Sequence, residues 1–182
     1  MPSFLSIGAY DGVHLGHQKI IKTLVRESRK GGCGGVLVYF PLPPKLVFSG
    51  ETENCLITLP AEREALLRKA GAGRVVALPF DRNLAAMSAE SFFDRVVLGE
   101  YGARGLVMGR DFALGKDRRG NAEFLEKRCA AAGIKFKSVH FAVHVGHKIS
   151  SSLIRAYLHN GHVEEANKCL GWNYSAGGKV VK

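Results

Sequence analysis

The chain alternates short apolar runs with longer amphipathic stretches, and this alternation constrains its fold more than any other feature. The apolar, strand-like runs cover residues 4–7, 36–40, 75–78, 106–108 and 135–145. Helices are predicted over residues 18–30, 58–70, 88–100 and 121–132, with two short ones broken at Gly161 within 150–170. Ser88 and Asn121 are the expected N-caps of two of these helices, and Leu66 and Leu67 form the apolar face of the helix over 58–70. Repeated strand-then-helix order is typical of a mostly parallel sheet with helices on both faces. We therefore predict an α/β fold with a doubly wound parallel sheet and two short C-terminal helices.

Composition excludes several classes of protein but does not indicate a function. The length of 182 residues suits one domain, and 46% hydrophobic with 23% charged residues excludes intrinsic disorder. No apolar run approaches the roughly 18 residues that span a bilayer. The 4 cysteines form no C-x-x-C pair, which indicates reduced thiols in a cytoplasmic protein. The net charge of +10 predicts a polyanionic partner such as nucleic acid, an acidic membrane or a nucleotide phosphate, unless it is only a solvated basic surface.

The segment that follows the first apolar run holds the densest group of candidate functional residues. Gly8 and Gly12 allow tight turns and close approach of a ligand to the backbone. His14 and His17 are three residues apart at the start of a helix, so both can face one side, and Gly16 leaves space between them. The helix N-terminus adds unpaired N–H donors and partial positive charge. This pattern favours a site for a transferring phosphoryl group over a pair of surface histidines beside a glycine turn.

Two later segments carry groups that suit phosphates or a metal ion. Ser150, Ser151 and Ser152 stand at an expected helix N-terminus, where hydroxyls cap the helix or bind phosphate oxygens. Arg155 lies about one turn further on, within reach of the same anion. Asp111 follows an expected strand at the ligand edge of the sheet, where a carboxylate binds Mg²⁺, holds the polar edge of a ring or caps a turn.

These segments together resemble a known family. His14-Leu-Gly-His17 is similar to the H-x-G-H signature of the nucleotidyltransferase superfamily. Residues 8–18 resemble the first motif of the FMN adenylyltransferase domain of prokaryotic FAD synthetases, the bifunctional riboflavin kinase/FMN adenylyltransferase family. The later motifs of the family are similar to further segments of this chain, in the same order: residues 40–44, 109–121 and 149–155. The resemblance implies a Rossmann-like sheet of the H-x-G-H nucleotidyltransferase type.

Several positions depart from the family pattern. Tyr10 stands where phenylalanine is usual, and Ser152 replaces a threonine but keeps the hydroxyl. Ala113 and Leu114 replace an Arg-Phe pair. The proline-rich stretch 41–44 lacks the histidine of the family's Pro-His-Pro pattern, and it opens the irregular stretch 41–57, a candidate binding loop.

The resemblance implies the reaction FMN + ATP → FAD + pyrophosphate, with Mg²⁺ spreading charge. It implies catalytic roles for His14, His17 and Arg155. The residues implied in ATP and phosphate binding are Gly8, Ala9, Tyr10, Asp11, Gly12, Gly16, Gly109, Ser150, Ser151 and Ser152. Those implied in flavin binding are Phe40, Leu42, Pro43, Phe80, Asp111, Phe112 and Leu114. Asp111 and Ser152 are the expected Mg²⁺ ligands.

The expected domain covers residues 1–172. Residues 173–182 resemble the approach to a riboflavin kinase domain, which is absent from this chain. Two alternatives stay open: another H-x-G-H adenylyl- or cytidylyltransferase, and a nucleotide- or flavin-binding module without catalysis. The expected partners are the small molecules ATP and FMN, with neither nucleic acid nor membrane, in the cytoplasm.

Overall fold

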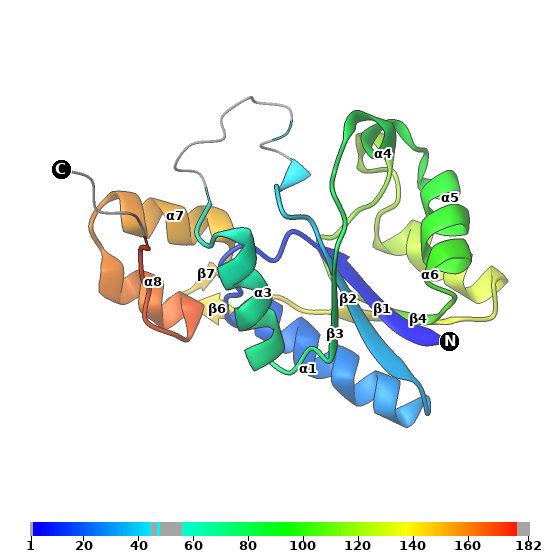
Figure 1. Ribbon diagram of the computed structural model, residues 1–182, viewed down its shortest axis with the longest axis horizontal. Helices are drawn as coiled ribbons and strands as arrows, with labels where there is room; N and C mark the ends of the chain where they lie inside the picture. The colour runs from blue at the N-terminus through cyan, green and yellow to red at the C-terminus, as the bar shows by residue number, and fades with distance from the viewer. Residues whose placement is uncertain (1, 45–46, 48–55, 178–182) are drawn as a thin grey trace.

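A parallel sheet of five strands forms the centre of the molecule (Figure 1). The computed structural model describes residues 2–44, 47 and 56–177. The strands are β1 (Ser3–Gly8), β2 (Gly34–Tyr39), β3 (Arg74–Ala77), β4 (Ala103–Gly109) and β5 (Lys135–Val139). They lie in the order β3-β2-β1-β4-β5 and pair in parallel throughout. The predicted doubly wound sheet is confirmed, and its order reverses between β1 and β4, the place where such sheets bind ligands.

Alternate strand residues face two separate cores, because successive side chains of a strand point to opposite faces. One face is covered by α1 (Leu15–Lys30) and α3 (Pro60–Lys69). The other is covered by α4 (Arg82–Ala86), α5 (Ala89–Phe92), the π-helix η1 (Phe93–Glu100) and α6 (Ala122–Ala131). Thus Leu5 and Leu106 pack in one core, whereas their neighbours Phe4 and Val107 pack in the other.

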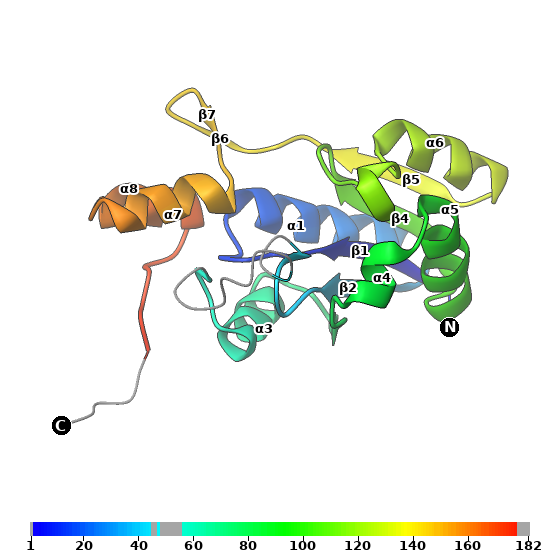
Figure 2. The same cartoon turned by 90° about the horizontal axis from the view of Figure 1, so that it is seen from above.

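The C-terminal helices pack on a third, smaller core. They are α7 (Ser151–His159) and α8 (Val163–Leu170), and the break between them lies at Gly161, as predicted. Figures 1 and 2 show them side by side at one end of the molecule, opposite the end that carries α5 and α6. Their buried residues pack with Ile57 and Ile149. No helix formed by the described residues is long and apolar enough to cross a membrane.

Two predicted elements need correction. The strand expected over 135–145 ends at Val139, and a small hairpin of β6 (Val143–His144) and β7 (His147–Lys148) follows it. Gly146 turns this hairpin with a φ of 76°, and Val145 beside it is 76% exposed. The helix expected over 88–100 changes from α to π geometry at Phe93. Alternating apolar residues continue beyond Val139 into an exposed hairpin, and the π-helix keeps an apolar face on the sheet, so periodicity alone shows neither change.

The cap of α6 gives a direct stability test. The Asn121 side chain accepts a hydrogen bond from the Phe124 N–H at 3.0 Å, as the sequence predicted. Asn121→Ala should lower the free energy of unfolding by about 1 kcal/mol, because the N–H loses its acceptor. Glu126→Ala, an exposed change on the same helix, should alter it by less than about 0.5 kcal/mol. Equal losses in urea unfolding of the two variants would contradict the capping role.

Candidate active site

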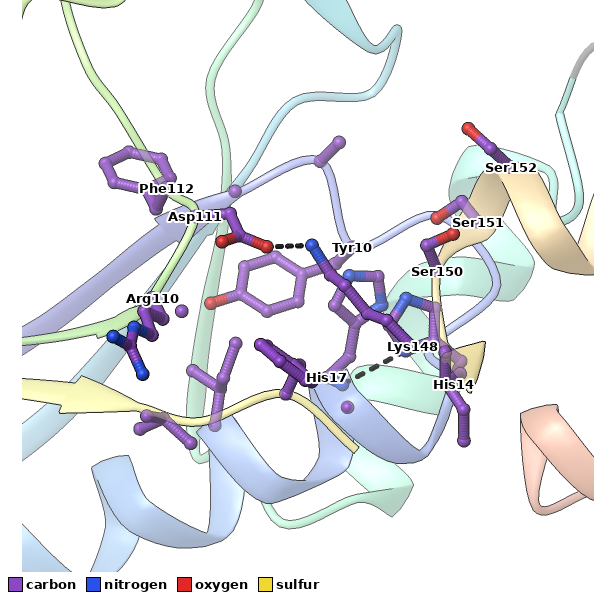
Figure 3. Close-up of a pocket in the computed structure, with 18 of the residues that line it drawn as sticks. Tyr10, His14, His17, Arg110, Asp111, Phe112, Lys148, Ser150, Ser151 and Ser152 are labelled. Carbon is purple, nitrogen blue, oxygen red and sulfur yellow. Dashed lines mark hydrogen bonds and ion pairs between the residues drawn. The ribbon is translucent and has the colours of Figure 1, made fainter. Parts of the chain in front are cut away.

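A cavity of about 710 Å³ opens beyond the carboxyl ends of β1 and β4 (Figure 3). The segments after β1, β4 and β5 and the first turn of α7 form its walls. The candidate residues that line it are Gly8, Ala9, Tyr10, His14, Gly16, His17, Pro43, Gly109, Asp111, Phe112, Ser150, Ser151, Ser152 and Arg155. Four segments that are distant in the sequence are thus brought to one place. Six other candidates are not in this lining: Asp11, Gly12, Phe40, Leu42, Phe80 and Leu114.

The two histidines form a stacked pair at the start of α1. His14 is the N-cap residue, so the helix begins at Leu15, three residues earlier than predicted. Its Nδ1 accepts a hydrogen bond from the His17 N–H at 3.3 Å. The two rings stack with centroids 3.6 Å apart, and the Tyr10 ring meets His17 edge-on at 5.0 Å. Because Nδ1 of His14 is an acceptor, a neutral His14 ring carries its proton on Nε2, which can donate to a phosphate oxygen.

Both histidines are held neutral near pH 7. Burial, together with a smaller effect of the positive charge of Lys148, lowers the pKa of His14 to about 4. The pKa of His17 is lowered well below its usual value, first by burial and then by His14 and Arg63. Burial disfavours the charged form of an imidazole, and a neighbouring cation does the same. Within the described part of the chain, the buried Nδ1 of His17 has no hydrogen-bond partner.

Tyr10 is anchored inside the protein by its hydroxyl group. Tyr10 is only 2% exposed, and its hydroxyl lies 2.6 Å from Ser6 Oγ, which in turn donates to the Val107 carbonyl of β4. Burial raises the pKa of the Tyr10 phenol, so the group stays protonated. The backbone of Tyr10 has a φ of 52°, an uncommon conformation for a non-glycine residue. Ser6 therefore supplies the polar partner that a tyrosine needs where the family usually has phenylalanine.

Asp11 is a buried anchor of the site. Its side chain is 1% exposed and forms an ion pair with Arg63 of α3, whose side chain is fully buried, at 3.0 Å. The same carboxylate accepts hydrogen bonds from the N–H groups of Ile57 and Thr58 and, at 3.3 Å, from Arg155. Protein groups thus occupy the Asp11 carboxylate. These contacts fix the conformation of the loop that contains Asp11.

Arg63 is a site residue that the sequence analysis missed. Its guanidinium donates to the carbonyls of Ala9, Phe40 and Pro41, and also to Thr58. It therefore ties α3 to the segments after β1 and β2. The one sequence signal is its position four residues before Leu67, on the helix face that was expected to be buried.

The start of α7 supplies hydroxyls and a cation. Ser150 is the N-cap and accepts a hydrogen bond from the Leu153 N–H at 3.2 Å, so capping is one of its roles. Ser151 Oγ donates to the Asp11 carbonyl at 2.9 Å. Ser152 is exposed, and Arg155 is 32% exposed and lines the cavity. Residues 150–152 therefore bond to the surrounding backbone and also place hydroxyl groups in the cavity wall.

Asp111 forms an ion pair with Lys148 of the small hairpin, a second residue the sequence analysis missed. Asp111 is the sole carboxylate among the residues that line the cavity, and in Figure 3 it lies on the opposite side from Ser152. Among the described residues no group of three or more histidine, cysteine or acidic side chains could hold a metal ion. A single carboxylate such as Asp111 fits Mg²⁺ that is bound mainly by the phosphates of a nucleotide and by water.

A second cavity of about 710 Å³ adjoins the first and has mainly apolar walls. Four residues expected to contact a flavin line it: Phe40, Phe80, Phe112 and Leu114. The rings of Phe40 and Phe80 meet edge-on at 5.3 Å. Phe112 and Arg118 line both cavities, which places the two side by side. Leu42 lines neither cavity, and residues 45–46 and 48–55 of the expected binding loop lie outside the described part.

The buried ion pair predicts a large loss of stability when it is broken. Arg63→Met should lower the free energy of unfolding by about 3–5 kcal/mol, since it leaves the Asp11 charge buried and unpaired. Arg68→Met on the same helix removes an ion pair with Glu64 between half-exposed side chains and should cost less than about 1 kcal/mol. Chemical denaturation measures both, and a loss for Arg63→Met as small as that for Arg68→Met would contradict the assignment.

The lowered histidine pKa predicts a dependence of stability on pH. Because the folded protein holds His14 neutral down to about pH 4, its contribution is complete above pH 6.5 and is lost as the pH falls towards 4. That loss amounts to about 3 kcal/mol. His14→Asn keeps a good capping residue, so its unfolding free energy should fall less over this range than that of the wild type. His159→Asn, an exposed change, should follow the wild type, and parallel curves for all three proteins would refute the prediction.

Comparison with known proteins places the chain in a family. A family model described as FAD synthetase matches residues 1–153. A bifunctional riboflavin kinase/FMN adenylyltransferase from Pseudomonas fluorescens is 31% identical, over 97% of this chain and 56% of that protein. The protein of the same name from Escherichia coli (strain K12) is 29% identical over the same shares. The chain thus spans little more than half the length of these two relatives.

Two further matches also cover nearly the whole of this chain. A candidate bifunctional riboflavin kinase/FMN adenylyltransferase from Geobacillus thermodenitrificans is 30% identical, over 96% of this chain and 92% of that protein. A crystal structure from Streptococcus pneumoniae, described as a macrolide-efflux protein, superposes with a TM-score of 0.82 at 30% identity. It covers 94% of this chain and 55% of that one. Since the FAD synthetase model matches residues 1–153 of the 182, this chain belongs to the FAD synthetase family.

Proposed function

We propose that the chain is an FMN adenylyltransferase, which transfers AMP from ATP to FMN and releases pyrophosphate. The observation that carries this proposal is the pair of adjoining cavities that meet at Phe112 and Arg118. The first offers cations, hydroxyls and paired imidazoles to phosphates, and the second offers aromatic walls to a flat ring system. The names of the relatives support the same reaction.

In this reaction an oxygen of the FMN phosphate attacks the α-phosphorus of ATP. A new P–O bond forms, the bond from the α-phosphorus to the oxygen that bridges to the β-phosphate breaks, and pyrophosphate leaves. His14 and His17 are the groups we assign to the α-phosphate, because they are neutral hydrogen-bond donors fixed at a helix N-terminus. They act by positioning and charge stabilisation, since phosphoryl transfer needs no covalent nucleophile from the protein.

Positively charged side chains in the cavity wall neutralise the negative charge of the outer phosphates. Arg155 and Lys148 line the first cavity, and Arg118 stands where the two cavities meet. The Arg118 guanidinium donates to the Asp111 carbonyl at 2.8 Å, which fixes it at this junction. We assign Arg118 to the phosphate of FMN, because this phosphate has to lie between the flavin ring and the α-phosphorus.

Mg²⁺, when bound, would shield the negative charge that gathers on the departing pyrophosphate. Asp111 and the phosphates of the substrate would hold it. The expected pairing of Asp111 with Ser152 has no support from their positions on opposite sides of the cavity. The cytoplasmic location stays a prediction from the sequence.

The direct test combines the protein with α-labelled ATP, Mg²⁺ and FMN, and separates the flavins. We expect labelled FAD and one pyrophosphate per FAD. His17→Gln should reduce kcat by about 10²–10³, because it removes one charge-stabilising contact. His159→Gln, an exposed histidine of α7, should retain the wild-type rate.

Acceptor competition separates this function from its alternatives. Phosphopantetheine and nicotinate mononucleotide, offered in place of FMN, should remain unlabelled. Transfer of the label to either acceptor in preference to FMN would refute the flavin assignment. Binding of FMN and ATP by folded protein without any FAD would favour a binding module instead.

A further inference from the structure

Three consecutive carbonyl groups of the catalytic loop are each held by a side chain from elsewhere. The Asp11 carbonyl accepts from Ser151 Oγ at 2.9 Å, and the Gly12 carbonyl accepts from the Trp172 indole N–H at 3.1 Å. The Val13 carbonyl accepts from Gln18 Nε2 at 3.0 Å. The next residue in the chain is His14, so the backbone that leads to the histidine pair is fixed by side-chain hydrogen bonds at each of these three residues.

This loop needs external support because its backbone is strained. Gly12 adopts a φ of 81° without strain because it lacks a Cβ, whereas the β-branched residue Val13 has a φ of 39°. A non-glycine residue in this region costs about 1–3 kcal/mol and persists only when surrounding contacts determine it. Without such contacts the loop would relax, and the cap at His14 would move with it.

The C-terminal segment provides much of this support. Gln18 donates to the Leu170 carbonyl at 2.8 Å as well as to Val13, so it links the loop to the end of α8. A Cβ built on Gly12 would lie 3.3 Å from the Leu170 side chain, which shows how closely α8 approaches the loop. The left-handed Gly171, with a φ of 74°, ends α8 and leads directly into Trp172.

We propose that Trp172 is a positioning residue of the active site, which holds Gly12 and thereby sets His14 and His17. The inference rests on the proposed adenylyl transfer. Trp172 is the sole tryptophan of the chain, and it lies beyond residues 1–153, the part that the family model matches. Neither Trp172 nor Gln18 lines either of the two cavities, so the role we assign to both acts through the loop.

Trp172→Phe tests this role, because it keeps an aromatic ring but removes the N–H donor. We expect kcat for FAD formation to fall about tenfold while KM for ATP changes less than threefold, since a small displacement of catalytic groups slows the reaction more than it weakens binding. The matched control is Tyr174→Phe, which also changes an aromatic residue packed on the C-terminal core. This variant should keep wild-type kcat. A Trp172→Phe enzyme within twofold of wild-type kcat, or equal losses in both variants, would overturn the proposal.

Tryptophan emission supplies a second readout that does not need turnover. Since Trp172 bonds to the loop, adding a non-hydrolysable ATP analogue should shift or quench its emission. In the double variant Trp172→Phe/Phe124→Trp the reporter stands on α6, on the opposite face of the sheet from α1, and should not respond. Nucleotide binding measured by calorimetry with no change in Trp172 emission would also overturn the positioning role. If the wild type binds the analogue and Trp172 responds but no FAD forms, the proposed function fails and the coupling of Trp172 to the site stands.

Discussion

The buried ion pair between Asp11 and Arg63 is the interaction on which the rest of the site depends. Moving two charges out of water is costly, and such a pair is retained only when further hydrogen bonds satisfy its remaining atoms. Here the Arg63 guanidinium also donates to four backbone carbonyls, and the Asp11 carboxylate also accepts from the backbone N–H groups of Ile57 and Thr58. The pair thereby joins the segments after β1 and β2 to α3, and Arg155 extends the network to α7. A hydrophobic pair of similar volume would pack there but could not hold these backbone groups in place.

The charge distribution of the cavity follows from this arrangement. Because protein groups occupy Asp11, the cavity lining keeps one carboxylate, Asp111, against cations that include Arg118, Lys148 and Arg155. Lys148 also helps to keep His14 neutral, and Arg63 does the same for His17, since a nearby cation disfavours imidazolium. Negatively charged phosphates, when bound, would have the opposite effect and favour protonation of the two histidines. Part of the net charge of +10 thus has a place in the site.

Sequence reasoning predicted the fold and the elements of the site but missed the contacts that assemble it. Strand and helix order, the caps at Ser88 and Asn121 and the facing histidines are local properties, so short stretches of sequence reveal them. Arg63 and Lys148 escaped notice because each has a partner far away in the chain, and an arginine in an amphipathic helix is usually exposed. The resemblance implied a role for Asp11 in ATP and phosphate binding, and the structure shows its carboxylate bonded to Arg63 and to backbone N–H groups in the protein interior. The roles of the candidate residues towards ATP and FMN stay predictions.

The central claim is that Asp11 and Arg63 assemble the site before any substrate binds. Amide hydrogen exchange of Ile57 and Thr58 in the ligand-free protein tests it most directly, since both N–H groups donate to Asp11. We predict that they exchange only through global unfolding, with the same free energy as the central strand β1. Exchange through local opening, at a free energy well below that of β1, would show that the ion pair does not hold the loop and would contradict the account.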